Sequence, residues 1–169
     1  MPKLTCGGTE RAASELANHI ASNGGNVTVL LMYNEELFYS LHQKVRLIQP
    51  PAGIRKRLGR FLYTVYLLPF LRSKIKVERP DLIFALGYIA FTLAASRGLP
   101  PKVIVSWRSS PTRVRFPHNK ILNLSYGLFH RLISNRVDGI IAQTRFAAKV
   151  YAPKYNVPIK VIPNFLRNL

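Results

Sequence analysis

The sequence predicts an α/β fold in which a parallel β-sheet is covered by helices on both faces. Short apolar runs alternate along the 169 residues with longer segments whose apolar residues recur at helical spacing. The short runs are apolar at consecutive positions, which is typical of parallel strands buried on both faces. With 48% hydrophobic residues, the chain can form a sizeable core, and a disordered chain is excluded.

The first half of the chain predicts two helices and three strands. The first helix spans residues 10–23 and ends at Gly24-Gly25, and the second spans residues 54–77 with an interruption or kink near Pro69. The apolar face of the first helix consists of Ala13, Leu16, Ala17, Ile20 and Ala21. The strands are predicted over residues 27–32, 45–48 and 82–86.

The second half continues the alternation. Gly87 leads from a strand into a helix of small residues that ends near Ser96, and residues 108–118 form a loop. Asn119 is expected to cap a helix whose apolar stripe consists of Ile121, Leu124, Leu128 and Leu132. Further strands are predicted over residues 103–106, 139–142 and 159–162, and a further short helix over 144–151.

A glycine pair, Gly7-Gly8, leads directly into the first helix. Glycines leave the backbone amides bare at a helix N-terminus, where the amides and the helix dipole favour a phosphate or another anion. The same pair also suits a tight turn without a ligand. Arg11 suits a phosphate contact as well as a pair with Glu15 one turn along. Only residues 4–6 offer a strand before the glycines, so the first strand is expected to be largely missing.

The charge of the chain is strongly positive. Twenty-five Lys and Arg residues oppose seven Asp and Glu residues, which gives a net charge of +18. Such a surface attracts lipid headgroups, nucleic acid or phosphorylated substrates. The single cysteine, Cys6, excludes an internal disulfide, and the scattered histidines His19, His42, His118 and His130 show no metal-ligand spacing. Among them, His118 lies in a basic loop where it could meet a substrate phosphate.

A basic cluster opens the second helix and precedes aromatic and aliphatic residues. Cations beside such residues are typical of a helix that lies in a membrane interface, and they also fit a core helix with a solvated basic end. We expect membrane contact through Arg55, Lys56, Arg57, Arg60 and Phe61. The apolar run over residues 61–71 is too short to span a bilayer, and no apolar run at the N-terminus suggests a signal peptide.

Several segments together resemble the N-terminal domain of the family 4 retaining glycosyltransferases, which have the GT-B architecture. These segments are GGTER over 7–11, RPDLIFALGY over 79–88, KVIVSWRSSP over 102–111, RVDGIIAQTRFAAKVY over 136–151 and IKVIPNF over 159–165. The resemblance implies a Rossmann-like domain over residues 1–162 as one half of a GT-B fold, with 163–169 beginning an interdomain linker. It also implies that a C-terminal domain binds most of the nucleotide-sugar donor.

The resemblance also implies limits. The family's pair of glutamates eight residues apart is absent from this chain, so residues 1–169 alone are expected to be inactive. GT-B enzymes typically need no metal ion, so we expect none, and no cofactor. Relatives often have Glu or His, with an Asn nearby, after the strand at 103–106, where this chain has Trp107, Arg108 and Ser109. The catalytic residues are therefore not assigned.

The resemblance and the sheet edge together predict two groups of binding residues. We expect a phosphate of the donor or acceptor at Gly7, Gly8, Thr9 and Arg11. We expect the acceptor at residues that follow predicted strands, namely Gly87, Trp107, Arg108, Ser109, Gln143 and Thr144. Packing of Gly87 and Trp107, solvation of Arg108 and helix capping by Thr144 are the structural alternatives.

The predicted function is transfer of a sugar from a nucleotide-sugar donor to a lipid-linked or cell-envelope glycan at the inner face of the membrane. The protein would then be cytoplasmic and peripheral, with an anionic membrane surface as a partner and without nucleic acid. A basic module that binds nucleic acid or another anionic surface is the alternative. A dinucleotide-binding enzyme fits poorly, because Gly7-Gly8 lacks the three-glycine fingerprint.

Overall fold

The computed structural model of the protein describes residues 1–108 and 118–163, except for the side chains of Tyr126, Phe129 and His130. Ser109, most of the predicted loop over 108–118 and nearly all of the predicted linker lie outside these residues. The helices are α1 (Gly8–Ser22), α2 (Ile54–Glu78), α3 (Ile89–Ser96), α4 (Lys120–Ser134) and α5 (Arg145–Tyr151). The strands are β1 (Thr28–Leu30), β2 (Arg46–Ile48), β3 (Leu82–Leu86), β4 (Lys102–Ser106), β5 (Gly139–Ala142) and β6 (Ile159–Val161).

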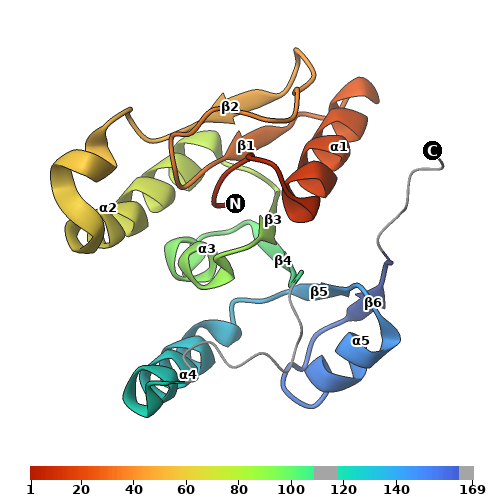
Figure 1. Ribbon diagram of the computed structural model, residues 1–169. Helices are drawn as coiled ribbons and strands as arrows, with labels where there is room; N and C mark the ends of the chain where they lie inside the picture. Colours follow the sequence, from red (N-terminus) through yellow and green to blue (C-terminus); the bar gives the residue numbers. More distant parts are fainter. Residues whose placement is uncertain (109–117, 164–169) are drawn as a thin grey trace.

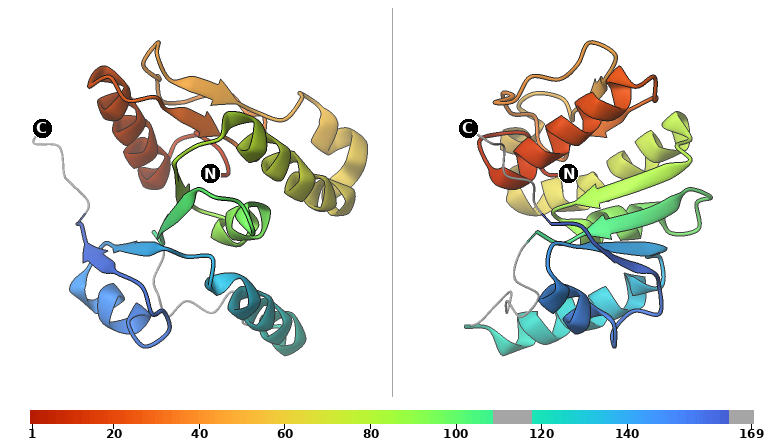
Figure 2. Two further views of the ribbon diagram at one scale, coloured as in Figure 1. Left: turned by 180° about the vertical axis from the view of Figure 1, so that it is seen from behind. Right: turned by 90° about the vertical axis from the view of Figure 1, so that its right-hand side faces the viewer.

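All described strand pairs are parallel, and they form two sheets. One sheet pairs β1 with β2, and the other has the order β3-β4-β5-β6. Helices α2, α3 and α4 cover one face of the strands, while α1 and α5 cover the other (Figures 1 and 2). The predicted α/β architecture, with a parallel arrangement and helices on both faces, is confirmed.

The segment before α1 lies between the two sheets. The backbone amide of Met32 donates to the carbonyl of Met1 at 3.0 Å, and the amide of Phe38 donates to the carbonyl of Leu4 at 2.9 Å. Leu4 is buried in one apolar cluster with Leu31 and Leu86, which follow or end β1 and β3. The segment therefore occupies the position that the central strand takes in a doubly wound sheet (Figure 1). It is not one of the strands of the described part of the chain.

The core lies between the strands and the helices of each face. Val103 and Val105 of β4 are fully buried and pack in one cluster with Ile140 of β5. A second cluster forms around the inward face of α2, whose buried members are Tyr63, Leu67, Phe70, Leu71 and Ile75. Short strands with near-continuous apolar sequence thus hold the carboxyl ends of the sheet in a fixed arrangement.

The predicted interruption of the second helix near Pro69 is wrong. The helical backbone continues through Pro69, and the non-helical residue is Gly59, with φ 70° and ψ 176°. Glycine adopts this positive φ without the steric cost that a side chain would impose. The segment around Pro69 stays helical because Leu67 and Phe70 on either side are buried in the core. The helical bond that proline removes would end at Val65, which is exposed, so water can satisfy that carbonyl.

The predicted apolar face of the first helix is only partly correct. Its small residues, Ala13, Ala17 and Ala21, are buried, whereas Leu16 and Ile20 are exposed. Three alanines spaced by four residues form a smooth stripe that can approach the strands closely. Leu16 and Ile20 lie beside that stripe. The buried face of the helix is therefore narrower than its apolar periodicity predicts.

Candidate functional site

The N-terminus of α1 is uncapped by any side chain. Gly7 is the N-cap residue, its backbone is extended, and the first helical hydrogen bond runs from the amide of Arg11 to the carbonyl of Gly7 at 2.9 Å. The amides of Gly8, Thr9 and Glu10 precede that bond, so they lack a helical acceptor. Backbone donors at the positive end of a helix dipole are suited to an anion.

The two glycines differ in their surroundings. A side chain at Gly8 would meet no atom within 4 Å, so this position opens to solvent. A side chain at Gly7 would collide with the carboxylate of Glu10, and the Tyr39 hydroxyl also contacts the Gly7 backbone. The carboxylate at this helix end is favourable to the dipole. Any anion that approaches here would have to displace or avoid the Glu10 side chain.

The position of α1 agrees with the general rule for ligands in open α/β sheets. In the right-hand view of Figure 2, the arrowheads of β3 and β4 point toward the side of the molecule at which α1 begins. Ligands of open α/β sheets bind beyond the carboxyl ends of the strands. The bare amides of α1 are therefore on the side where a ligand is expected.

Arg11 forms the helical ion pair that was one of its two predicted roles. Its Nε lies 2.9 Å from Oε1 of Glu15, and this hydrogen bond raises the pKa of the Arg11 guanidinium. The side chain thus extends along the helix toward Glu15. A phosphate contact by Arg11 would require the side chain to leave that partner.

Gly87 directly follows β3 and has a backbone conformation that favours glycine. Its φ is 62°, and the following Tyr88 also has a positive φ of 42°. A Cβ at Gly87 would lie 3.0 Å from the ring of Pro2, so the chain before α1 fills the space next to it. Positive φ is uncommon for tyrosine, and such strain concentrates at functional sites and tight turns.

Trp107 and Arg108 follow β4, as predicted. The ring of Trp107 packs against Tyr151 and Tyr155, with centroids 5.0 Å and 5.3 Å apart, so much of this side chain belongs to the core. Partial burial lowers the pKa of the Arg108 guanidinium. Just before them, the buried hydroxyl of Ser106 has no hydrogen-bond partner within the described part of the chain.

Gln143 and Thr144 follow β5. Thr144 caps α5, because its Oγ1 accepts a hydrogen bond from the amide of Ala147 at 3.0 Å. The capping alternative for Thr144 is therefore confirmed. Gln143 is half-buried at the same edge of the sheet, between the strand and the cap.

An aromatic cluster at this edge was not predicted. Tyr33 and Tyr88 follow β1 and β3, and their rings meet edge to face at 6.3 Å. The guanidinium of Arg55 lies over the Tyr33 ring, 4.7 Å from its centroid, as a cation–π pair. The signal was present in the sequence, because both tyrosines come soon after predicted strands, where a ligand of an open α/β sheet is expected.

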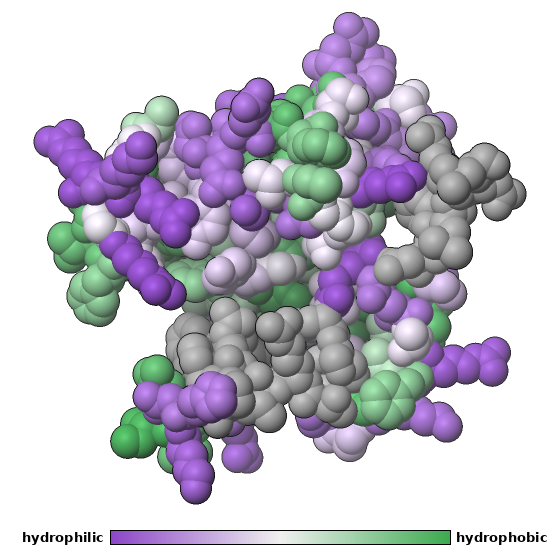
Figure 3. Space-filling view, viewed as in Figure 1, coloured by the Kyte–Doolittle hydropathy of each residue, from purple (hydrophilic) through white to green (hydrophobic). Residues whose placement is uncertain are grey.

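The basic start of α2 is followed by an exposed apolar face. Lys56, Arg57 and Arg60 are exposed, and Phe61 is 80% exposed. The exposed face continues through Leu62, Val65 and Leu68. Figure 3 shows this combination at its left side, where hydrophobic surface lies directly beside strongly hydrophilic residues over α2. Cations next to exposed aromatic and aliphatic residues are the composition of an interfacial helix.

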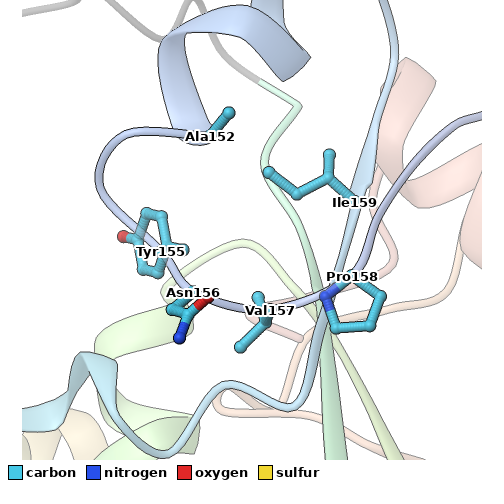
Figure 4. Close-up of a pocket in the computed structure, with 6 residues that line it drawn as sticks. All are labelled: Ala152, Tyr155, Asn156, Val157, Pro158 and Ile159. Atoms are coloured by element: carbon cyan, nitrogen blue, oxygen red, sulfur yellow. The ribbon is translucent and has the colours of Figure 1, made fainter.

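A surface hollow lies elsewhere, at the start of β6. It is lined by Ala152, Tyr155, Asn156, Val157, Pro158 and Ile159. Figure 4 shows these residues along the turn that joins the end of α5 to the strand. None of them is charged, and the strand begins here, whereas open α/β sheets place ligands where strands end. We assign no function to this hollow.

Within residues 1–108 and 118–163, no three His, Cys, Asp or Glu side chains gather as metal ligands would. No helix in the same ranges combines the length and apolar character needed to cross a membrane.

The fold and the site define a Rossmann-like half domain whose first helix begins, without a side-chain cap, at the carboxyl edge of its strands. Comparison with protein families matches residues 6–167 to the model of glycosyltransferase family 4. No curated protein matches the sequence. Because the family match covers nearly the whole chain, the protein belongs to glycosyltransferase family 4.

Proposed function

We propose that the chain is the N-terminal, acceptor-side domain of an enzyme that transfers a hexose from a nucleotide-sugar donor with retention at the anomeric carbon. Family membership and the uncapped N-terminus of α1 support this proposal. The domain extends over residues 1–162, residues 163–169 begin a linker, and a C-terminal domain holds most of the donor. Residues 1–169 alone are then inactive.

The amides of Gly8 and Thr9 would face a phosphate of the donor or the acceptor, and the Gly7 amide would join them after leaving the Tyr39 hydroxyl. Gly8 supports this role best, because it is exposed and no atom lies within 4 Å of the position that a Cβ would take. Arg11 would join them after leaving Glu15. A phosphate at this place gains from several backbone donors and from the helix dipole together.

The acceptor would lie along the carboxyl ends of β3, β4 and β5. The proposed contacts are Gly87, Trp107, Arg108, Ser109, Gln143 and Thr144. Their positions after consecutive strands of one sheet support the assignment, except for Ser109, which lies outside the described residues. Trp107 is half-buried, so part of its side chain is accessible to a sugar.

The acceptor is proposed to be a lipid-linked or cell-envelope glycan at the inner face of the membrane, which makes the protein cytoplasmic and peripheral. The exposed basic and apolar residues at the start of α2, with Phe61 80% exposed, support membrane contact there. A cluster of four to eight cations gains about 1 kcal/mol per residue near an anionic leaflet. Arg55 contributes less directly, since it lies over Tyr33.

Two measurements test the function. The DNA downstream of Leu169 should encode a second domain with two glutamates eight residues apart. The protein that contains both domains should transfer label from a nucleotide-sugar to an acceptor in a membrane lipid extract, with an unchanged anomeric configuration. A protein without such a domain, or one that inverts the configuration, would contradict the proposal.

A basic module that binds nucleic acid is the second candidate, and the net charge of +18 favours it. Its basic residues are distributed over several helices, without a single reading helix. Salt-dependent binding to random-sequence duplex, with no response to a nucleotide-sugar in the protein that contains both domains, would favour this candidate over the glycosyltransferase.

A further inference from the structure

Helix α4 carries an exposed apolar stripe that no other part of the described chain buries. The stripe consists of Ile121, Leu124, Leu128 and Leu132, which are between 57% and 81% exposed. Their spacing of three to four residues keeps them on one side of the helix over its whole length. Single exposed apolar residues are common, but a contiguous row of them on a soluble domain marks a contact surface.

Cations lie beside this stripe. Lys120 and Arg131, near the two ends of α4, line a shallow hollow together with Leu124 and Leu128. No Asp or Glu occurs anywhere in the sequence between Asp81 and Asp138. No acidic residue of this part of the sequence neutralises the two cations. The surface therefore favours an anionic partner.

The stripe lies on the same face of the strands as the exposed part of α2. Helix α3 contacts both helices and lies between them. Figures 1 and 2 show α2, α3 and α4 on one side of the molecule, and Figure 3 shows hydrophobic surface beside hydrophilic residues over α2 and again over α4 at the lower left. Two amphipathic surfaces thus occur on one side.

We propose that α4 is a second membrane-binding helix, which places its leucines in the interface of an anionic bilayer while Lys120 and Arg131 contact lipid phosphates. Amphipathic helices with basic flanks bind such surfaces through buried apolar area and electrostatic attraction together. A second copy of this chain is a poorer partner, because it would bring the same cations against each other. The proposal extends the membrane contact proposed for α2 but does not depend on it.

The test is flotation of the 169-residue protein with two kinds of vesicle, one of phosphatidylcholine alone and one in which about one lipid in three is phosphatidylglycerol. We expect binding to the anionic vesicles. The variant L124S/L128S should partition roughly tenfold more weakly per leucine removed. The variant K120Q/R131Q should lose about fivefold per charge, and added salt should remove this difference.

Matched controls come from the opposite face of the strands. Leu16→Ser changes an exposed leucine of α1, and R145Q/K149Q removes two exposed cations of α5, so both variants should float like the wild type. The exposed stripe contributes little to the core, so circular dichroism should show L124S/L128S to be folded. Emission from Leu124→Trp, above the Trp107 background, should be quenched by lipids brominated on the acyl chains.

Three results would overturn the proposal. One is a wild-type protein that ignores anionic vesicles. Another is normal flotation of both α4 variants together with loss of flotation in variants of Arg57, Arg60 and Phe61. That result would assign membrane binding to α2 alone and would leave the proposed function intact. The third is normal flotation of L124S/L128S with a lower mass in sedimentation, which would show that a second copy covers the stripe.

Discussion

The Tyr39 hydroxyl is hydrogen-bonded to both backbone groups of Gly7. It donates to the Gly7 carbonyl at 3.1 Å and accepts from the Gly7 amide at 3.3 Å. Tyr39 belongs to the segment between β1 and β2, so these bonds tie that segment to the residue that caps α1. They hold Gly7 in place, directly before the amides of Gly8 and Thr9 that have no helical acceptor.

Tyr39→Phe should loosen this attachment. Loss of the hydroxyl removes both hydrogen bonds, which should lower the free energy of unfolding by about 1 kcal/mol. Urea denaturation measures the change, and hydrogen exchange should show faster exchange of the Gly7 amide. Ser40→Ala, at an exposed neighbouring position, is the control. Unchanged exchange at Gly7 would show that the bonds to Tyr39 do not hold the glycine pair.

Gly8→Ala should separate a structural role from a binding role. The added methyl group meets nothing within 4 Å and Gly8 is the first residue of α1, so the substitution should raise the free energy of unfolding by a few tenths to about 1 kcal/mol. If the amide of Gly8 contacts a phosphate, the same methyl group should weaken binding of inorganic pyrophosphate. Thermal unfolding measures the stability, and calorimetric titration measures the affinity for pyrophosphate. Higher stability with an unchanged pyrophosphate affinity would contradict a phosphate at Gly8.

Tyr63 should make the fold sensitive to alkaline pH. Its hydroxyl donates to the carbonyl of Met32 at 2.5 Å, and burial raises its pKa to about 12, above the ordinary tyrosine value of 10.0. Because the folded state keeps its proton at higher pH than the unfolded state, the stabilisation is complete below pH 10.0 and declines as the pH rises toward about 12.

Tyr63→Phe should therefore be less stable near neutral pH, by about 1 kcal/mol, and should lose less stability than the wild type between pH 10 and 12. Urea denaturation at several pH values measures both effects. Tyr66→Phe, one turn along the same helix, is the control. Parallel pH profiles for the wild type and Tyr63→Phe would contradict the assignment.

Arg136 joins three segments at the amino end of β4. Its guanidinium donates to the carbonyls of Ser96, Leu99 and Pro101 and pairs with Asp138 at 2.8 Å. Arg136→Ala should lower the free energy of unfolding by about 2–4 kcal/mol, because three carbonyls lose a charged donor. Arg97→Ala, at an exposed position nearby, should change it by less than about 0.5 kcal/mol. Equal effects in denaturant titrations would show that the Arg136 bonds contribute little.

Much of the fold could be predicted because local patterns and tertiary packing agree. The strand at residues 139–142 and the caps at Asn119 and Thr144 were predicted at their observed positions, since an apolar run and a capping side chain act locally. The position of the break in α2 could not be predicted, because core packing keeps Pro69 in the helix while Gly59 takes the unusual backbone.

Less of the candidate site could be predicted from the sequence. The choice of Arg11 between a phosphate and Glu15 depends on the side-chain conformation, and the packing of Trp107 depends on tyrosines more than forty residues along the chain. The sequence predicted the apolar stripe on α4 but not its exposure. Whether a stripe is exposed depends on how the other described elements pack around the helix. Periodicity identifies an apolar face and does not identify its partner.

The most direct test of the account is an NMR titration of the ¹⁵N-labelled protein with inorganic pyrophosphate and with UDP-glucose. We predict that the amide resonances of Gly8 and Thr9 shift first and saturably with both ligands, and that Gly8→Ala reduces these shifts. Shifts confined to the basic residues of α2 and α4, with those two amides unchanged, would contradict an anion site at the start of α1.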